Sequence, residues 1–158
     1  MRRSNRLAHG WAEKSARLAV KNVLVVDDDP SIRDLLAEEL RYLGYSVITA
    51  RNGSEALDRL HVMTPDVIVL DLIMPVMDGW TFVDRYRDPA RRRSVPIIAV
   101  SAEGDVCPGY EALGVTAFLR KPFDLNELAD CIAQLTLARK GSGASLSPDT
   151  ASNHVTHG

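Results

Sequence analysis

The segment Val67–Gly79 constrains the fold of this chain more than any other stretch. Its first four residues, Val67–Leu70, are apolar and mostly β-branched, which predicts a strand buried on both faces, as in a parallel sheet. Asp71 follows where that strand should end, because Pro75 cannot extend the ladder and Asp78–Gly79 predicts a turn and a helix start. We therefore expect Asp71 at the carboxyl edge of a central strand, where open α/β sheets place their chemistry. Taken alone, an aspartate there could equally cap a loop.

Short apolar strands and helical stripes alternate along the chain. Apolar runs predict strands over residues 23–26, 46–50, 67–70, 96–100 and 117–119. Helical periodicity, together with capping and stop residues, predicts helices over about 30–43, 53–63, 79–87 and 125–135. This alternation predicts an α/β fold whose parallel sheet carries helices on both faces, joined by right-handed crossovers.

The length of 158 residues accommodates one domain with tails. We place a basic leader at residues 1–21, a compact domain at 22–139 and a disordered polar tail at 140–158. The leader is expected to be a mobile or loosely docked tail, and the alternative is a partner-binding amphipathic helix.

Composition and charge exclude several classes of protein. No apolar run approaches the ~20 residues that cross a bilayer, and the leader lacks the features of a secretory signal. Cys107 and Cys131 are isolated, which argues against a disulfide or zinc framework and favours a reducing cytoplasm. Basic residues concentrate in the leader and leave the compact region net acidic, which argues against direct binding of nucleic acid.

Polar side chains directly follow four of the predicted strands and should meet at one edge of the sheet. They are Asp27, Asp28, Asp29, Asp71, Ser101 and Lys121. Two carboxylates ~4 Å apart repel by about 4 kcal/mol at an effective dielectric near 20, so this cluster needs a proton or a cation. Oxygen ligands at an open site favour Mg²⁺, and a carboxylate that attacks phosphorus forms an acyl phosphate. The sequence therefore predicts a site for a tetrahedral dianion with Asp71 as the nucleophile.

At this point the motifs match a known family. From about Val23 to Leu137 the chain resembles the receiver domain of two-component response regulators, of the chemotaxis type. The resemblance rests on four motifs, of which the second is followed by Pro75 and Gly79: Val25-Val26-Asp27-Asp28-Asp29-Pro30, Val69-Leu70-Asp71, Val100-Ser101-Ala102 and Leu119-Arg120-Lys121-Pro122-Phe123. It implies a flavodoxin-like (βα)5 sandwich whose parallel strands lie in the order 2-1-3-4-5.

The resemblance also implies a ligand set. Asp71 would accept a phosphoryl group from a phosphohistidine on a sensor histidine kinase or a histidine phosphotransfer protein. Asp28, Asp71 and the backbone carbonyl of Ile73 would bind Mg²⁺ directly, whereas Asp27 would act mainly through water. Asp29 is expected to cap the first helix instead of binding metal.

The resemblance assigns the remaining site residues to the phosphoryl group and to the switch. Lys121 would pair with the phosphoryl oxygens and Ser101 would hydrogen-bond one of them, while the small Ala102 leaves access. Phe118 would be the aromatic switch residue, and the alternative is a plain core residue. The peptide bond before Pro122 would be cis.

Two departures from the family pattern stand out. The segment from Ser101 to Lys121 is about two residues short and carries Pro108-Gly109 where a helix should run. Since proline costs ~3 kcal/mol inside a helix, we expect that helix to be short or to begin at Pro108. This puts in doubt the usual surface for a receiver homodimer.

Ile73 and Glu103 lie two residues after Asp71 and Ser101, at positions that in the family shape water access to the acyl phosphate. Bulky Ile73 is expected to slow water attack and so to prolong the phosphoryl form.

The leading hypothesis is a stand-alone receiver, since the tail is too short and polar to fold as an output domain. It would be a phosphoacceptor signalling protein and not a conventional enzyme, and it would switch the binding of an unidentified target or relay its phosphate. One alternative is a binding module that keeps only the fold. A third is a phosphatase of the haloacid-dehalogenase type, whose Asp-x-Asp motif Asp27-x-Asp29 superficially fits.

Overall fold

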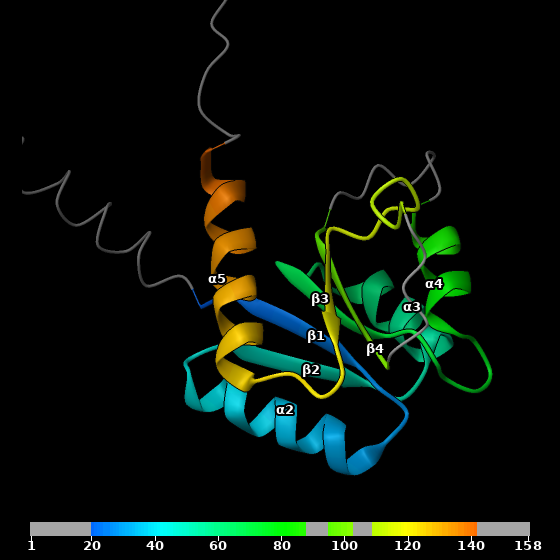
Figure 1. Cartoon of the computed structure of the whole chain (residues 1–158), viewed down its shortest axis with the longest axis horizontal. Helices are drawn as coiled ribbons and strands as arrows, with labels where there is room; N and C mark the ends of the chain where they lie inside the picture. Colours follow the sequence, from blue (N-terminus) through cyan, green and yellow to red (C-terminus); the bar gives the residue numbers. More distant parts are fainter. Residues whose placement is uncertain (1–19, 88–94, 103–108, 142–158) are drawn as a thin grey trace, which may run out of the picture.

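The computed structural model describes residues 20–87, 95–102 and 109–141, with side chains up to residue 137 (Figure 1). The five strands are β1 (Asn22–Val26), β2 (Ser46–Ala50), β3 (Val67–Asp71), β4 (Ile97–Ser101) and β5 (Ala117–Arg120). The helices within these described residues are α2 (Pro30–Tyr42), α3 (Gly53–Val62), α4 (Gly79–Tyr86) and α5 (Leu125–Gly141). All strand pairs are parallel, and the order β2-β1-β3-β4-β5 confirms the predicted flavodoxin-like topology.

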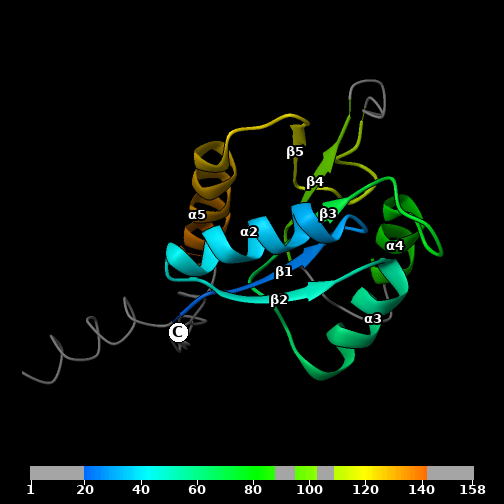
Figure 2. The ribbon, with the colours of Figure 1, turned by 90° about the horizontal axis from the view of Figure 1, so that it is seen from below.

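The sheet separates two apolar cores because successive side chains of a strand point to opposite faces. In β1, Val23 and Val25 join one core, whereas Leu24 and Val26 join the other. Helices α2 and α5 cover the first face, while α3 and α4 cover the second (Figures 1 and 2). The predicted three-layer arrangement is therefore confirmed.

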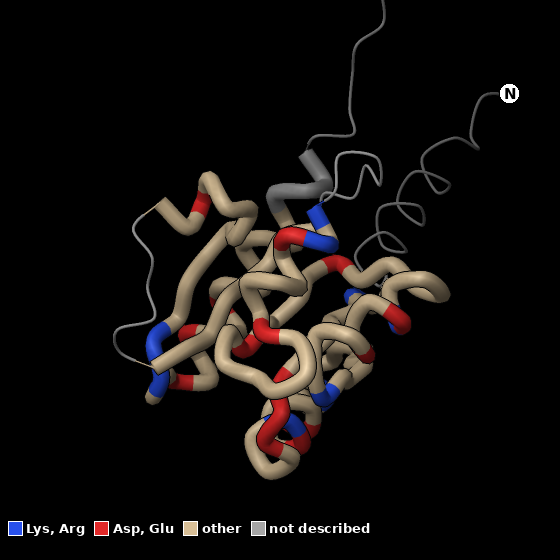
Figure 3. The backbone as a smooth tube through the Cα atoms, turned by 90° about the vertical axis from the view of Figure 1, so that its right-hand side faces the viewer, with Lys and Arg blue, Asp and Glu red and all other residues tan. Residues whose placement is uncertain are grey.

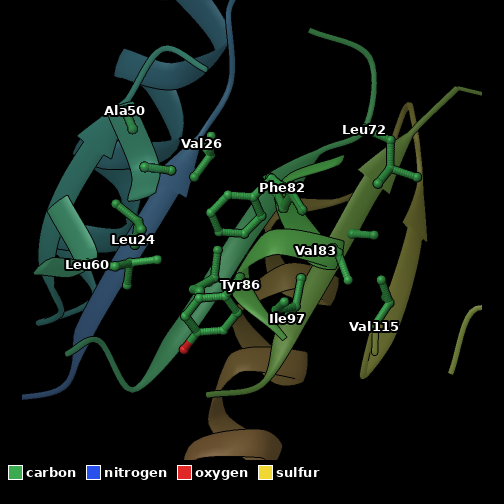
Figure 4. Packing of buried hydrophobic residues seen from close by; sticks show 14 of the residues in the cluster. Leu24, Val26, Ala50, Leu60, Leu72, Phe82, Val83, Tyr86, Ile97 and Val115 are labelled. Atoms are coloured by element: carbon green, nitrogen blue, oxygen red, sulfur yellow. The ribbon is translucent and has the colours of Figure 1, made fainter. Parts of the chain in front are cut away.

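Aromatic packing anchors α4 against the sheet. Phe82 and Tyr86 stack with ring centroids 5.7 Å apart and pack beside Leu24 and Leu60 (Figure 4). Every residue of the neighbouring strands β3 and β4 is buried, as their continuous apolar runs predict. Strand β3 is thus held from both faces, and its carboxyl end has a defined position.

Short polar side chains begin the helices at the same edge of the sheet. The Asp29 carboxylate accepts the backbone N–H of Ser31 at 2.8 Å at the start of α2, and Asp78 does the same for Thr81 at the start of α4. Gly44, with a φ of +92°, ends the turn after α2. These caps fix where the loops that follow β1 and β3 turn back into helices.

The connection between β4 and β5 differs from the sequence-based expectation. Of its described part, Gly109–Gly114 forms consecutive turns with i to i+3 hydrogen bonds, and no helix forms there. Gly109 and Gly114 both have positive φ, which breaks helical geometry at each end. The expectation of a helix that begins at Pro108 and runs through this stretch is therefore wrong. The other expectation, a short helix before Gly109, falls on residues 103–108, which lie outside the described residues.

Two further expectations concern the ends of the chain. Apart from residues 20–21 and 140–141, the basic leader and the polar tail lie outside the described residues. Within the described residues, no helix combines the length and the apolar character that a membrane span requires.

Candidate functional site

Three carboxylates meet at the carboxyl edge of the sheet. Asp27 and Asp28 follow β1, and Asp71 is the last residue of β3, the strand that pairs with β1. One carboxylate oxygen from each residue lies within 4.8 Å of the others. The ends of two separate strands thus assemble the acidic cluster that the sequence predicted.

Hydrogen bonds hold Asp27 at several of its atoms. Its backbone N–H donates to the Ala50 carbonyl at 3.1 Å, and its Oδ1 accepts the N–H of Asp29 at 2.9 Å. Its Oδ2 lies 3.3 Å from the Lys121 Nζ. With only 3% of its surface exposed, Asp27 is a buried member of the cluster.

Asp71 is equally buried, with 6% of its surface exposed. Its Oδ1 accepts the N–H of Ile73 at 3.2 Å, and its Oδ2 lies 3.5 Å from the Lys121 Nζ. Burial raises the pKa of the Asp71 carboxyl above its ordinary value. The Ile73 N–H and the Lys121 ammonium oppose that rise, whereas the charges of Asp27 and Asp28 add to it.

Lys121 is the cation between the two buried carboxylates. Its backbone N–H donates to the Ser101 carbonyl at 2.8 Å, which continues the β4–β5 ladder by one residue. The Lys121–Pro122 peptide bond is cis, as the resemblance implied. The end of β5 therefore aims an ammonium group at the acidic cluster.

Ser101 and Phe118 lie on the two strands beyond β3. Ser101 is the last residue of β4, is 1% exposed and stands beside the end of β3, while Ala102 after it is exposed. Phe118 in β5 is partly buried and contacts Tyr110, with ring centroids 5.9 Å apart. Glu103 lies outside the described residues.

The loop after β3 packs closely beneath the site. Gly79 donates its N–H to the Leu72 carbonyl at 2.9 Å, and a Cβ at this position would lie 2.7 Å from the Asp71 carbonyl oxygen. Only glycine permits this approach of α4 to the end of β3. Ile73, in the same loop, is 62% exposed beside the Asp71 carboxylate.

The sequence interpretation missed Arg33. Its Nη1 donates to the Asp27 backbone carbonyl oxygen at 2.8 Å, so a second cation contacts the loop that carries Asp27 and Asp28. Acidic residues outnumber basic ones in the described part of the chain and recur along its helices and loops (Figure 3). The sequence signal that could have revealed this contact is a basic residue at the start of a helix, where the macrodipole disfavours positive charge.

The donor set of this cluster fits Mg²⁺. All three side chains offer carboxylate oxygens, the ligands that a hard divalent cation prefers, and Asp28 is exposed so that water can complete the coordination shell. Among the residues that the structure describes, no sulfur or imidazole group joins this cluster, a donor set that suits Mg²⁺ better than zinc. A divalent ion here would also relieve the mutual repulsion of the carboxylates.

The family assignment follows from the sequence match. The profile of the Response regulator receiver domain matches residues 23–133, well over half of the chain. The chain belongs to this family. A receiver domain is a phosphoacceptor signalling module and not a classical enzyme, and the acidic pocket is typical of its Mg²⁺-dependent phosphorylation site.

Individual relatives support the assignment. The chain is 43% identical over 131 residues to the transcriptional regulatory protein PrrA of Mycobacterium tuberculosis, covering 81% of this chain and 54% of that protein. It spans about half the length of the curated relatives that it matches.

Two solved structures share the fold. The chemotaxis response regulator CheY4 of Vibrio cholerae is 35% identical, with a TM-score of 0.67 over 74% of this chain and 99% of that one. The response regulator TrrA of Thermotoga maritima, solved in complex with Mg²⁺ and BeF, is 33% identical, with a TM-score of 0.66 over 73% of this chain and 99% of that one.

Replacing Asp71 by Asn should stabilise the metal-free protein. The neutral amide removes a buried charge from an acidic cluster, so the free energy of unfolding in EDTA at pH 7 should rise. Urea denaturation measures this change, and Asp34→Asn on the exposed face of α2 is the control, which should leave stability nearly unchanged.

The sign of the pH dependence follows from the raised pKa of Asp71. Above its folded-state pKa the buried carboxylate destabilises the wild type, and this penalty disappears as pH falls toward the ordinary value of 3.8. The advantage of the Asn variant should therefore shrink with acidification. An Asn variant that is less stable than the wild type at pH 7 would contradict this account.

Proposed function

We propose that Asp71 is the phosphoacceptor of this receiver domain. The observation that carries the proposal is the position of its buried carboxylate, which joins two other carboxylates and lies 3.5 Å from the Lys121 ammonium. A carboxylate nucleophile in an acidic cluster repels an incoming phosphoryl group unless positive charge is present. Lys121 and a divalent ion would together supply that positive charge.

We propose that Asp28, Asp71 and the backbone carbonyl of Ile73 are the direct ligands of Mg²⁺, while Asp27 acts mainly through water. Asp28 is exposed, and the Asp27 oxygens are held at 2.9 and 3.3 Å by Asp29 and Lys121. The Asp71 oxygens have longer contacts, 3.2 and 3.5 Å, which supports this division. When bound, the ion would neutralise the carboxylates and draw the incoming phosphoryl oxygens toward Asp71.

In the transfer step an oxygen of the Asp71 carboxylate bonds to phosphorus while the bond from phosphorus to the donor nitrogen breaks. The nitrogen keeps the electron pair of that bond. Lys121 would then pair with the oxygens of the new acyl phosphate, and the Ser101 hydroxyl would donate to one of them. The location of both groups at the ends of neighbouring strands supports these roles.

The partners follow from the same chemistry. We propose that a cytoplasmic sensor histidine kinase or a histidine phosphotransfer protein is the donor, and that small, exposed Ala102 leaves the path to Asp71 open. Phe118 would move inward as Ser101 shifts, and this movement would change the outer surface of β5. The changed surface would alter the binding of a target, of a relay protein or of a second copy in a homodimer.

Incubation with acetyl phosphate and Mg²⁺ should add one phosphoryl group to the wild type and none to Asp71→Asn. Intact mass spectrometry measures the gain directly. Omission of Mg²⁺ from the wild-type reaction is the matched control and should abolish the gain. A wild type that never gains mass would favour the alternative of a binding module that keeps only the fold.

Replacing Ile73 by Asn should shorten the life of the phosphoryl group. The exposed Ile73 side chain stands beside Asp71, and an amide in its place would admit and orient water. We expect loss of phosphate to speed up by about tenfold, which is less than the ~10²–10⁴-fold of a positioned general base, because an amide orients water without taking its proton. Val76→Asn, at another exposed apolar position of the same loop, serves as the control. An unchanged or slower decay in Ile73→Asn would refute the role of Ile73.

A further inference from the structure

Arg33 makes a contact that a surface arginine of a helix does not need. Its side chain turns back six residues along the chain, and its Nη1 donates to the Asp27 carbonyl oxygen at 2.8 Å. Arg33 is partly buried, whereas Ser31 and Asp34 on the same turn are exposed. The guanidinium therefore lies against the loop that carries Asp27 and Asp28.

The place of Arg33 on its helix runs against local preference. Positive charge is disfavoured near the N-terminus of a helix, where the macrodipole is itself positive, and the Asp29 carboxylate that caps α2 is the acidic group at this end. Arg41, in the last turn of α2, has the favoured placement. A residue that breaks a local rule is expected to be retained for another purpose.

The contact completes the fixation of Asp27. The Asp27 N–H donates to Ala50, its Oδ1 accepts from Asp29 and its Oδ2 pairs with Lys121. Arg33 adds a hydrogen bond to a further atom of Asp27, the backbone carbonyl oxygen. That carbonyl belongs to the peptide that joins Asp27 to Asp28. Fixing this peptide plane therefore also fixes the direction from which the exposed Asp28 side chain leaves the backbone.

We propose that Arg33 is a positioning residue that holds the Asp27–Asp28 peptide so that the Asp28 carboxylate points into the metal site. The inference rests on the proposed function, in which Asp28 and Asp71 bind Mg²⁺. Arg33 acts through the backbone, as the outer partners of metal ligands commonly do.

A role of Arg33 through its charge and a role through positioning predict opposite changes in Mg²⁺ affinity when Arg33 is replaced. Removal of a cation near three carboxylates should strengthen the attraction for a divalent ion. Loss of positioning should weaken binding, because the Asp28 carboxylate would then have to be ordered at the moment the ion binds. The direction of the change in Mg²⁺ affinity therefore separates the two roles.

The experiment measures Mg²⁺ affinity by calorimetry for the wild type, Arg33→Met, Arg33→Lys and Arg41→Met. Arg41 is a matched control because its Nη2 also donates to a backbone carbonyl, that of Val47, at 3.1 Å on the same helix but away from the acidic cluster. We expect Arg33→Met to weaken binding about tenfold, the low end of the loss for such outer partners. Arg33→Lys should recover most of the affinity and Arg41→Met should match the wild type. Equal or tighter binding by Arg33→Met would overturn the proposal.

A second measurement needs no metal. Amide hydrogen exchange in EDTA should be faster at Asp29, whose N–H bonds to Asp27, in Arg33→Met but not in Arg41→Met. Unchanged exchange at Asp29 would also overturn the proposal. A wild type that fails to bind Mg²⁺ would instead refute the metal site itself, and the exchange measurement would still decide whether Arg33 holds the loop.

Discussion

The repulsion among three carboxylates at one edge of the sheet is the constraint on which the rest of this structure depends. Asp27 and Asp71 are buried beside each other, where an unpaired charge is costly. One carboxylate oxygen from each of these residues and one from Asp28 lie within 4.8 Å of one another. The Lys121 ammonium, within 3.5 Å of both buried carboxylates, offsets part of that cost. The repulsion that Lys121 does not offset favours the binding of a divalent ion. The bound ion would in turn favour the arrival of a phosphoryl group.

The fold supplies the rigidity that such a cluster requires. Strand β3 is buried on both faces and pairs with β1 and β4, so Asp71 leaves the sheet at a fixed point. The cap at Asp29 and the close approach of Gly79 determine how the loops after β1 and β3 turn. Stability is thus concentrated around a site that is itself unfavourable without its ligands, as is common where function opposes stability.

Local patterns were enough to predict the strands and the acidic cluster, whereas the sheet order followed from the family resemblance. Polar residues stand at or next to the ends of four of the predicted strands, so the parallel topology brings Asp71 and Lys121 together. Two features depend on tertiary context and could not be predicted in this way. The turns over Gly109–Gly114 replace an expected helix because positive-φ glycines break it, and the reach of Arg33 to Asp27 is a matter of side-chain direction.

A crystal structure of the protein grown with Mn²⁺ in place of Mg²⁺ tests the central claim most directly, because the anomalous signal of manganese locates the ion without ambiguity. The account predicts a single strong anomalous peak in contact with carboxylate oxygens of Asp28 and Asp71, with Lys121 still beside Asp71. It would be contradicted by the absence of a peak among these carboxylates at saturating Mn²⁺, or by a peak held elsewhere on the chain.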